Sequence, residues 1–342
     1  MIGNIEFNER MKHYKVPGLS IALIDKGQIS ETETHGFLKS GSHKNVRDNT
    51  IFNACSISKF LTGILVLKIT EQGLLQLDEN VNMKLTSWKI PDNELTIHKK
   101  VTLRNLLSHQ SGIIDPEQSF MELKSRNDIP SMRDLLNGDT PFCNQAIEVK
   151  YEPESEFNYS DAGYCIIQLL VEDVTMKPFE QVVKELIFEP LMMENSTFPY
   201  KLLEKIEEFS CGHNKSGEIV EGEFPIYPYP AASGLWTTPS DLSKLVLELL
   251  DALRGESKLG ISASKAKEMI SPQGRSWIGL GVFLGTLNNE FEISSLGWGV
   301  GFQCMMIVLP YLEKGAVIMT NAELGVHQLE GIIGEFYRSL KI

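Results

Sequence analysis

The sequence predicts a mixed α/β fold, and two observations support this. Strand-like runs lie near both ends of the chain, and a helical pattern with long loops fills the middle, from about 80 to 275. Strands from the two ends would then share one sheet. We therefore expect one domain over residues 1–342, with an α/β lobe from about 1–75 and 276–342 and a helical lobe over about 76–275 inserted between the two parts.

The first part of the chain predicts a helix, a hairpin and a buried helix in turn. Residues 4–14 have the spacing of a short amphipathic helix, which V-P-G at 16–18 ends. The run 19–24 and the segment 28–36 are separated by the turn signal D-K-G, which predicts a β-hairpin. After a polar loop, the stretch from Ser56 to Gly73 is apolar on nearly every side, which is typical of a buried central helix.

The rest of the chain predicts helices first and strands afterwards. Helical spacing indicates helices at 102–107, 162–174, 179–188 and 239–250. From 276 the pattern changes, and β-rich runs alternate with turn signals such as N-N and E-K-G. These runs cover 277–287, 291–295, 302–309 and 316–320. Apolar residues at a spacing of 3.6 between Val326 and Leu340 predict a final helix.

The composition argues against several classes of function. The formal net charge is −13, from 32 basic and 45 acidic residues, so we expect neither nucleic acid nor an anionic membrane as a partner. The five cysteines have no paired spacing and the seven histidines are scattered, so we expect no disulfide framework and no metal site. The expected partner is a small molecule or a short peptide.

The chain carries no pattern typical of export or membrane insertion. Its first residues, M-I-G-N-I-E-F, lack a basic region followed by an apolar run, and no apolar stretch is long enough to span a bilayer. For the chain as given we therefore expect a cytoplasmic location.

Ser56 and Lys59 form a candidate catalytic pair at the start of the buried helix. A serine hydroxyl needs a base to accept its proton as it attacks, and residues three apart on a helix share a face. The helix N-terminus would also favour a developing oxyanion. The S-x-x-K spacing recurs at Ser262 and Ser264, in a polar helical pattern where a serine is more typical as a cap. On this motif alone, Ser56 also fits the role of an N-cap.

Several further segments match, in order, motifs of one protein superfamily. They read S-I-S-K at 56–59, L-Q-L-D-E at 75–79, L-L-S-H-Q-S-G at 106–112, Y-S-D-A-G-Y at 159–164, F-E-P-L-M at 188–192 and G-L-W-T-T-P-S-D-L at 234–242. With these motifs the chain resembles the serine β-lactamase and penicillin-binding-protein superfamily. The resemblance is to its class C β-lactamase-related branch, which includes D-peptidases and esterases. It spans nearly the whole chain.

The resemblance implies both a fold and a set of site residues. The fold is an antiparallel sheet flanked by terminal helices, beside an all-α lobe, with the active site between them. Ser56 would be the acylated nucleophile, and Lys59 and Tyr159 would share the proton transfers. The backbone N–H groups of Ser56 and Trp298 would form the oxyanion hole, and no cofactor is needed. In this family the loop around His109 buttresses the site, so His109 is interpreted as structural.

Two candidate substrate-binding positions depart from the family pattern. Asp161 stands where the second motif usually has asparagine, and an ionised carboxylate cannot donate a hydrogen bond to a substrate carbonyl. Beside Lys59 it would also favour the ammonium over the free amine. The third motif usually reads K-T-G or H-x-G, whereas here Ser295 takes the place of the cation and Gly297 is kept. The glycine is consistent with close approach of substrate to that strand.

These features together predict a serine hydrolase that works through an acyl-enzyme. Its substrate would be a small amide, a short peptide that can contain D-amino acids, a β-lactam or an ester. A strict β-lactamase or D-alanine carboxypeptidase is disfavoured, because both usually recognise a substrate carboxylate through the cation of the third motif. The alternative is a non-catalytic ligand-binding or penicillin-sensing protein on the same scaffold, which Asp161 and Ser295 favour. The sequence leaves the oligomeric state open.

Overall fold

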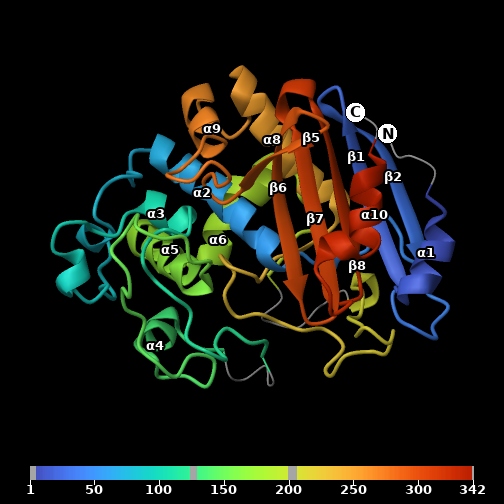
Figure 1. Ribbon diagram of the computed structural model, residues 1–342, viewed down its shortest axis with the longest axis horizontal. Helices are drawn as coiled ribbons and strands as arrows, with labels where there is room; N and C mark the ends of the chain where they lie inside the picture. The colour runs from blue at the N-terminus through green and yellow to red at the C-terminus, as the bar shows by residue number, and fades with distance from the viewer. Residues whose placement is uncertain (1–4, 124–128, 199–205, 341–342) are drawn as a thin grey trace.

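An antiparallel sheet joins the two ends of the chain (Figure 1). The computed structural model describes residues 5–123, 129–198 and 206–340. Within these residues the sheet has six strands in the order β2-β1-β8-β7-β6-β5. The strands are β1 (Gly18–Asp25), β2 (Gln28–Gly36), β5 (Phe283–Leu287), β6 (Glu290–Gly299), β7 (Phe302–Leu309) and β8 (Lys314–Thr320). The pairing of β1 with β8 brings the chain ends together, which confirms the mixed α/β class.

Two helices from opposite ends of the chain cover one face of this sheet. They are α1 (Phe7–Tyr14) and α10 (Ile332–Ser339), drawn in blue and red in Figure 1. Successive side chains of a strand point to opposite faces. Along β7, Met305 and Ile307 accordingly face the cluster under α1 and α10, whereas Cys304 and Met306 face the main core.

The other face of the sheet contacts α8 (Pro239–Arg254), which packs against β1 and β8. Residues 239–254 fall in the stretch expected to form the helical lobe, yet this helix forms a layer on the sheet. Its leucines enter the same buried core as β7 and β8. The division into two lobes therefore stays a proposal. With a boundary at about 276, α8 would be assigned to the helical lobe although it packs on the sheet.

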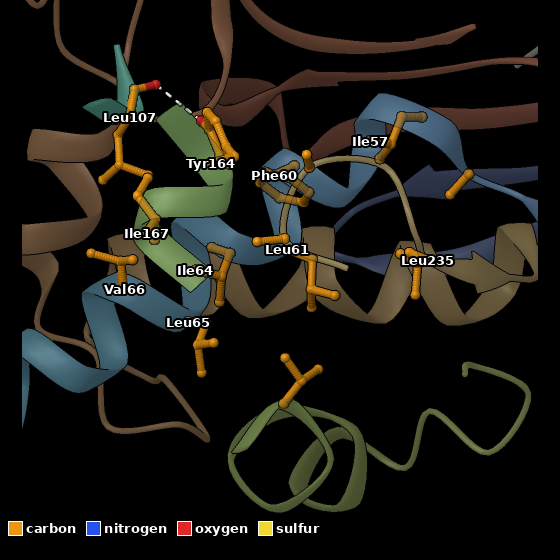
Figure 2. Close-up of a cluster of buried hydrophobic side chains, with 14 of the residues drawn as sticks. Ile57, Phe60, Leu61, Ile64, Leu65, Val66, Leu107, Tyr164, Ile167 and Leu235 are labelled. Atoms are coloured by element: carbon orange, nitrogen blue, oxygen red, sulfur yellow. Dashed lines mark hydrogen bonds between the residues drawn. The ribbon is translucent and has the colours of Figure 1, made fainter. Parts of the chain in front are cut away.

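The central helix α2 (Ser58–Glu71) is buried along almost its whole length, as its apolar sequence predicts. Figure 2 shows Phe60, Leu61 and Ile64 of this helix near Tyr164 and Ile167. Those two residues belong to α5 (Asp161–Thr175). The Tyr164 hydroxyl donates a hydrogen bond to the carbonyl oxygen of Leu107 at 3.0 Å. This bond joins α5 to α3 (Leu103–Leu107), and the shared core packs α2 together with α5. Both α2 and α5 begin at the candidate site.

Shorter elements complete the described chain. The remaining α-helices are α3 (Leu103–Leu107), α4 (Met132–Asn137), α6 (Phe179–Val183), α7 (Glu189–Leu191) and α9 (Ala263–Met269), with a π-helical turn at Lys184–Phe188 and several short 3-10 helices. A separate two-stranded sheet pairs β3 (Phe52–Asn53) with β4 (Trp236–Thr237). No helix in the described ranges has both the length and the apolar character needed to cross a membrane.

The strand expected from residue 277 begins only at Phe283. The intervening backbone bonds elsewhere: the N–H of Leu280 donates to Met269 and that of Gly281 to Leu107. Gly281 also has a φ of +78°, a left-handed conformation that interrupts a strand. The prediction was wrong at this end because the backbone of residues 278–282 turns: the N–H of Gly279 donates to Val282, and Ile278 forms only an isolated bridge with Phe283.

Candidate active site

Ser56 lies in a tight turn, the 3-10 helix η1 (Cys55–Ile57), which connects β3 to α2. Cys55 has a left-handed backbone with a φ of +48°, and its N–H donates to the Asn53 side chain at 2.8 Å. The Ser58 hydroxyl donates to the carbonyl of Cys55 at 2.6 Å and accepts from the N–H of Leu235 at 3.0 Å. These bonds fix the direction in which the chain presents Ser56.

Lys59 lies in the first turn of α2, where its ammonium reaches three acceptors. The Nζ atom is 3.4 Å from the Ser56 hydroxyl, 3.0 Å from the carbonyl oxygen of Ala232 and 2.5 Å from an oxygen of Asp161. Only 4% of the Lys59 side chain is exposed. A buried charge is stable only when it is paired, and these contacts provide the pairing.

The surroundings of Lys59 keep it protonated. Burial acts to lower the pKa of this ammonium, but the charge of Asp161 and the neighbouring Tyr159 outweigh burial, so the pKa is raised above its ordinary value. At neutral pH the side chain is therefore an ammonium. In that form it donates to the Ser56 oxygen and cannot accept its proton.

Tyr159 lies directly above the lysine, in the loop that leads into α5. The Lys59 Nζ atom is 4.8 Å from the centre of the Tyr159 ring and 5.4 Å from that of Tyr164. Desolvation raises the pKa of the Tyr159 phenol, while the charge of Lys59 and hydrogen bonding to Ser56 act in the opposite direction. The phenol is thus neutral at neutral pH and linked to both candidate catalytic partners. The residue keeps 41% of its surface exposed.

His109 stacks against the ring of Tyr159. The two rings stack with centroids 4.3 Å apart and planes inclined by 25°. The Nδ1 atom of His109 accepts the N–H of Ser160 at 3.1 Å. Burial and the nearby charge of Lys59 hold the pKa of His109 well below its usual value, so the ring is neutral. These contacts fit the structural role expected for this residue.

The structure also brings a residue to the site that the sequence reasoning missed. Asp115 accepts hydrogen bonds from the Ser160 hydroxyl at 2.8 Å and from the N–H groups of Asp161 and Ala162 at 2.8 and 2.9 Å. As a single aspartate in a loop it has no pattern of its own. The available signal was its position, three residues after the L-L-S-H-Q-S-G segment.

The third motif approaches the Ser56 turn through backbone rather than side chains. A methyl group added at Gly297 would come within 2.4 Å of the Ala54 carbonyl oxygen and 2.3 Å of the Cys304 sulfur. The Cys304 thiol donates to that same Ala54 oxygen at 3.1 Å. The Gln328 amide donates to the carbonyl of Gly297 at 2.9 Å. Strand β6 is therefore held tightly against the segment that precedes Ser56.

Ser295 and Trp298 lie on the same strand but on different faces. Ser295 is two residues from Gly297 and so faces the core, with 5% of its surface exposed. Its hydroxyl makes no hydrogen bond to any residue that the structure describes. The Trp298 side chain faces the other way and is 43% exposed. Only the backbone of Trp298 is therefore on the side of Ser56, where its N–H was expected to contribute to the oxyanion hole.

The other S-x-x-K matches lie outside this constellation. Ser262 is the N-cap of α9, where its hydroxyl accepts the N–H of Lys265 at 3.4 Å. That confirms the expectation of a capping serine for Ser262, whereas Ser264 lies inside α9 and is not its cap.

Comparisons with known proteins agree with the fold described above. The family model for beta-lactamase matches residues 6–330. Protein flp of Staphylococcus aureus (strain MW2) is 22% identical over 320 residues, or 90% of this chain and 60% of that protein. The chain thus spans about 60% of the length of this curated relative.

Solved structures show the same fold at low sequence identity. A D-amino acid amidase from Ochrobactrum anthropi SV3 has a TM-score of 0.72 at 21% identity, with 91% of this chain and 90% of the amidase covered. EstCE1, described as a hydrolase with promiscuous acyltransferase activity, has a TM-score of 0.74 at 20% identity, with 97% and 96% covered. Because the family model extends over nearly the whole chain, this protein belongs to the beta-lactamase family.

Proposed function

We propose that the protein is a serine hydrolase that forms an acyl-enzyme through Ser56, Lys59 and Tyr159. The observation that carries this proposal is the 3.4 Å contact between the Lys59 ammonium and the Ser56 hydroxyl, with the Tyr159 ring 4.8 Å from the same nitrogen. A nucleophile and its proton-transfer partners within such reach are what acyl transfer requires.

The proposed reaction has two steps. In the first, the Ser56 oxygen attacks the substrate carbonyl, its proton passes to the Lys59–Tyr159 pair, and that pair protonates the leaving amine or alcohol. In the second, water attacks the ester at Ser56, the same pair accepts a proton from this water, and that proton passes to the Ser56 oxygen as the acid product leaves. Backbone N–H groups of Ser56 and Trp298 would stabilise the oxyanion in both steps.

Asp161 determines which protonation state begins this reaction. Because it holds Lys59 as an ammonium, the proton acceptor at neutral pH is a minor form in which Lys59 or Tyr159 has lost a proton. The rate should therefore rise with pH until that form dominates.

The proposed substrates are small neutral amides, esters and short peptides, including those with D-amino acids. The absence of a cation at Ser295 supports this class, because the third motif then lacks a charged partner for a substrate carboxylate. Of the proteins with a similar fold, one is named a D-amino acid amidase and another a hydrolase with promiscuous acyltransferase activity, which is compatible with the proposal.

One observation favours a second candidate, a non-catalytic ligand-binding or penicillin-sensing protein. The 2.5 Å ion pair between Lys59 and Asp161 stabilises the lysine in the form that cannot act as a base. A protein of this kind would bind its ligand, or be acylated once, without turnover.

Mass spectrometry of the intact protein separates the two candidates. The protein is incubated with a fluorophosphonate, β-lactams, activated esters and D-amino-acid amides, and adducts are mapped. The hydrolase predicts an adduct on Ser56 that decays with turnover, and a Ser56→Ala variant that is not labelled. Ser262→Ala is the matched control and should label normally. A stable adduct without product supports the sensor, and labelling that persists in Ser56→Ala refutes both.

A further inference from the structure

The segment that begins at His109 forms a series of hydrogen bonds with the loop that carries Tyr159 and Asp161. The carbonyl of His109 accepts the N–H of Asn158 at 2.8 Å, and that of Gln110 accepts the N–H of Glu154 at 2.7 Å. The side chain of His109 accepts the N–H of Ser160, two residues after Asn158. Asp115 completes this series at the first turn of α5.

We propose that Asp115 is a positioning residue that fixes the carboxylate of Asp161 against Lys59. This inference rests on the proposed function of the Ser56 site. The carboxylate of Asp115 accepts the N–H groups of the first two residues of α5, Asp161 and Ala162. One of its oxygens also accepts the Ser160 hydroxyl, and the Ser160 oxygen in turn accepts the N–H of Gly163 at 3.0 Å.

This arrangement provides acceptors for the amides of the first turn of α5. Those amides have no partner within the helix, and the N-terminus of the helix favours negative charge. Asp115 supplies that charge from another segment of the chain. Rotation of the first turn of α5 would break these bonds, so the Asp161 side chain is held in one direction, with an oxygen 2.5 Å from Lys59.

The carboxyl group of Asp115 interacts electrostatically with Asp161 of the site. Burial and the neighbouring Asp161 raise the pKa of the Asp115 carboxyl, while the three hydrogen bonds act to lower it. Loss of the hold of Asp115 on Asp161 would let the Asp161 carboxylate move away from Lys59 and weaken the field that keeps Lys59 protonated. This change acts toward a lower pKa of Lys59.

Several titratable groups surround Lys59. They are Asp161, Tyr159, Tyr164 and Cys165 on or next to α5, His109 after α3, and Cys55 in η1. His109 is neutral at neutral pH, and burial raises the pKa values of Cys55 and Tyr164 above their ordinary range. Asp161 is therefore the group whose negative charge acts on Lys59 near neutral pH.

The chain offers a matched control with the same set of donors. Glu248, which is buried, accepts hydrogen bonds from the Ser257 hydroxyl and from the N–H groups of Lys258 and Leu259 at 3.0 and 3.1 Å. The loop that it binds contacts Lys68. Lys68 is nine residues along α2 from Lys59, or about 13 Å at 1.5 Å per residue.

The experiment compares Asp115→Asn with Glu248→Gln by two measurements. The first is the pH dependence of fluorophosphonate labelling at Ser56. The second is an NMR titration of protein labelled with ¹³C at the lysine ε-carbon, with the Lys59 signal assigned from a Lys59→Arg variant. For Asp115→Asn we expect the alkaline limb and the Lys59 titration to move down by roughly one pH unit. The maximal labelling rate should fall roughly tenfold because Asp161 and Tyr159 are displaced.

A purely structural role gives a different result. Glu248→Gln should lower the melting temperature and leave both pH profiles unchanged, and the inference fails if Asp115→Asn behaves in the same way. Should Asp115→Asn not fold, Asp115→Glu keeps the charge but displaces it, and it must lower the labelling rate with a smaller pH shift. If the wild type is not labelled at any pH, the proposed function fails, but the NMR titration still tests Asp115.

Discussion

The second and third motifs both approach the Ser56 turn, but they are held there by different forces. Tyr159 and Asp161 are fixed by charges and hydrogen bonds, from Lys59 on one side and from His109 and Asp115 on the other. Gly297 is fixed by the close fit of its backbone to Ala54 and Cys304. A change of pH should therefore affect mainly the second-motif side of the site, and a change of side-chain volume mainly the third-motif side.

The largest effect is expected from removing the Lys59 charge, which pairs with Asp161 of the second motif. Lys59→Ala deletes the group that contacts both Ser56 and Asp161, so the labelling rate and kcat/KM should fall roughly 10²–10⁴-fold, as for loss of a general base. Lys68→Ala, on the same helix but bound to Leu259, is the control and should keep its activity. Near-normal turnover in Lys59→Ala would show that another group accepts the proton.

The next largest effect tests the fit on the third-motif side. Gly297→Ala places a methyl group 2.4 Å from the Ala54 oxygen, so β6 must move away from the Ser56 turn. We expect the labelling rate to fall roughly 10²-fold, as for a misplaced oxyanion donor, and the free energy of unfolding to fall by about 1–3 kcal/mol. In Gly285→Ala, on β5, the nearest atom would be 3.6 Å away. If both variants behave alike, the fit at Gly297 has no special role.

A third prediction concerns pH, on the side that depends on charge. Asp161 raises the pKa of Lys59, so if the free amine is the base, the rate rises with pH only in the alkaline range. Asp161→Asn removes that charge and lowers the pKa of Lys59. The limb of the pH–rate profile should therefore move to lower pH by roughly 1–3 units. Asp173→Asn, at the other end of α5, is the control. An unchanged profile would mean that Lys59 is not the titrating base.

The smallest expected effect concerns substrate choice at Ser295. Wild-type protein should turn over a substrate with a methyl-esterified carboxylate better than the matched free acid, since Ser295 offers only a neutral hydrogen bond. Ser295→Lys should narrow or reverse this preference, because a charge-assisted bond is roughly twice as strong. Ser295→Met controls for side-chain length. The measurement is kcat/KM for both substrates, and a wild-type preference for the free acid would contradict the idea.

The elements with strong patterns could be predicted from the sequence. The hairpin of β1 and β2 is confirmed, and so is the buried character of α2, because turn chemistry and apolar periodicity are local properties. The position of α8 was not predictable in this way. Its apolar face predicts that one side of the helix is buried. The identity of the packing partners, β1 and β8, is known only from the tertiary structure.

The site shows the same limit. Ser56, Lys59, Tyr159 and Asp161 were identified because each lies in a short motif, and the structure brings their side chains together. Asp115 and the carbonyl of Ala232 were missed, because their contribution depends on where the backbone passes. For Asp161 the sequence suggested proximity to Lys59, and the structure adds the cause, a first turn of α5 held by Asp115.

The left-handed backbone at Cys55 has a consequence for engineering this protein. For a residue with a Cβ atom, such a conformation costs about 1–2 kcal/mol, and glycine would avoid most of this cost. The Cys55 side chain is buried in the core, however, so Cys55→Gly would also leave a cavity that destabilises the fold. The same substitution would give the chain before Ser56 more backbone freedom, so a strained backbone at this position is the cost of a filled core and a fixed nucleophile.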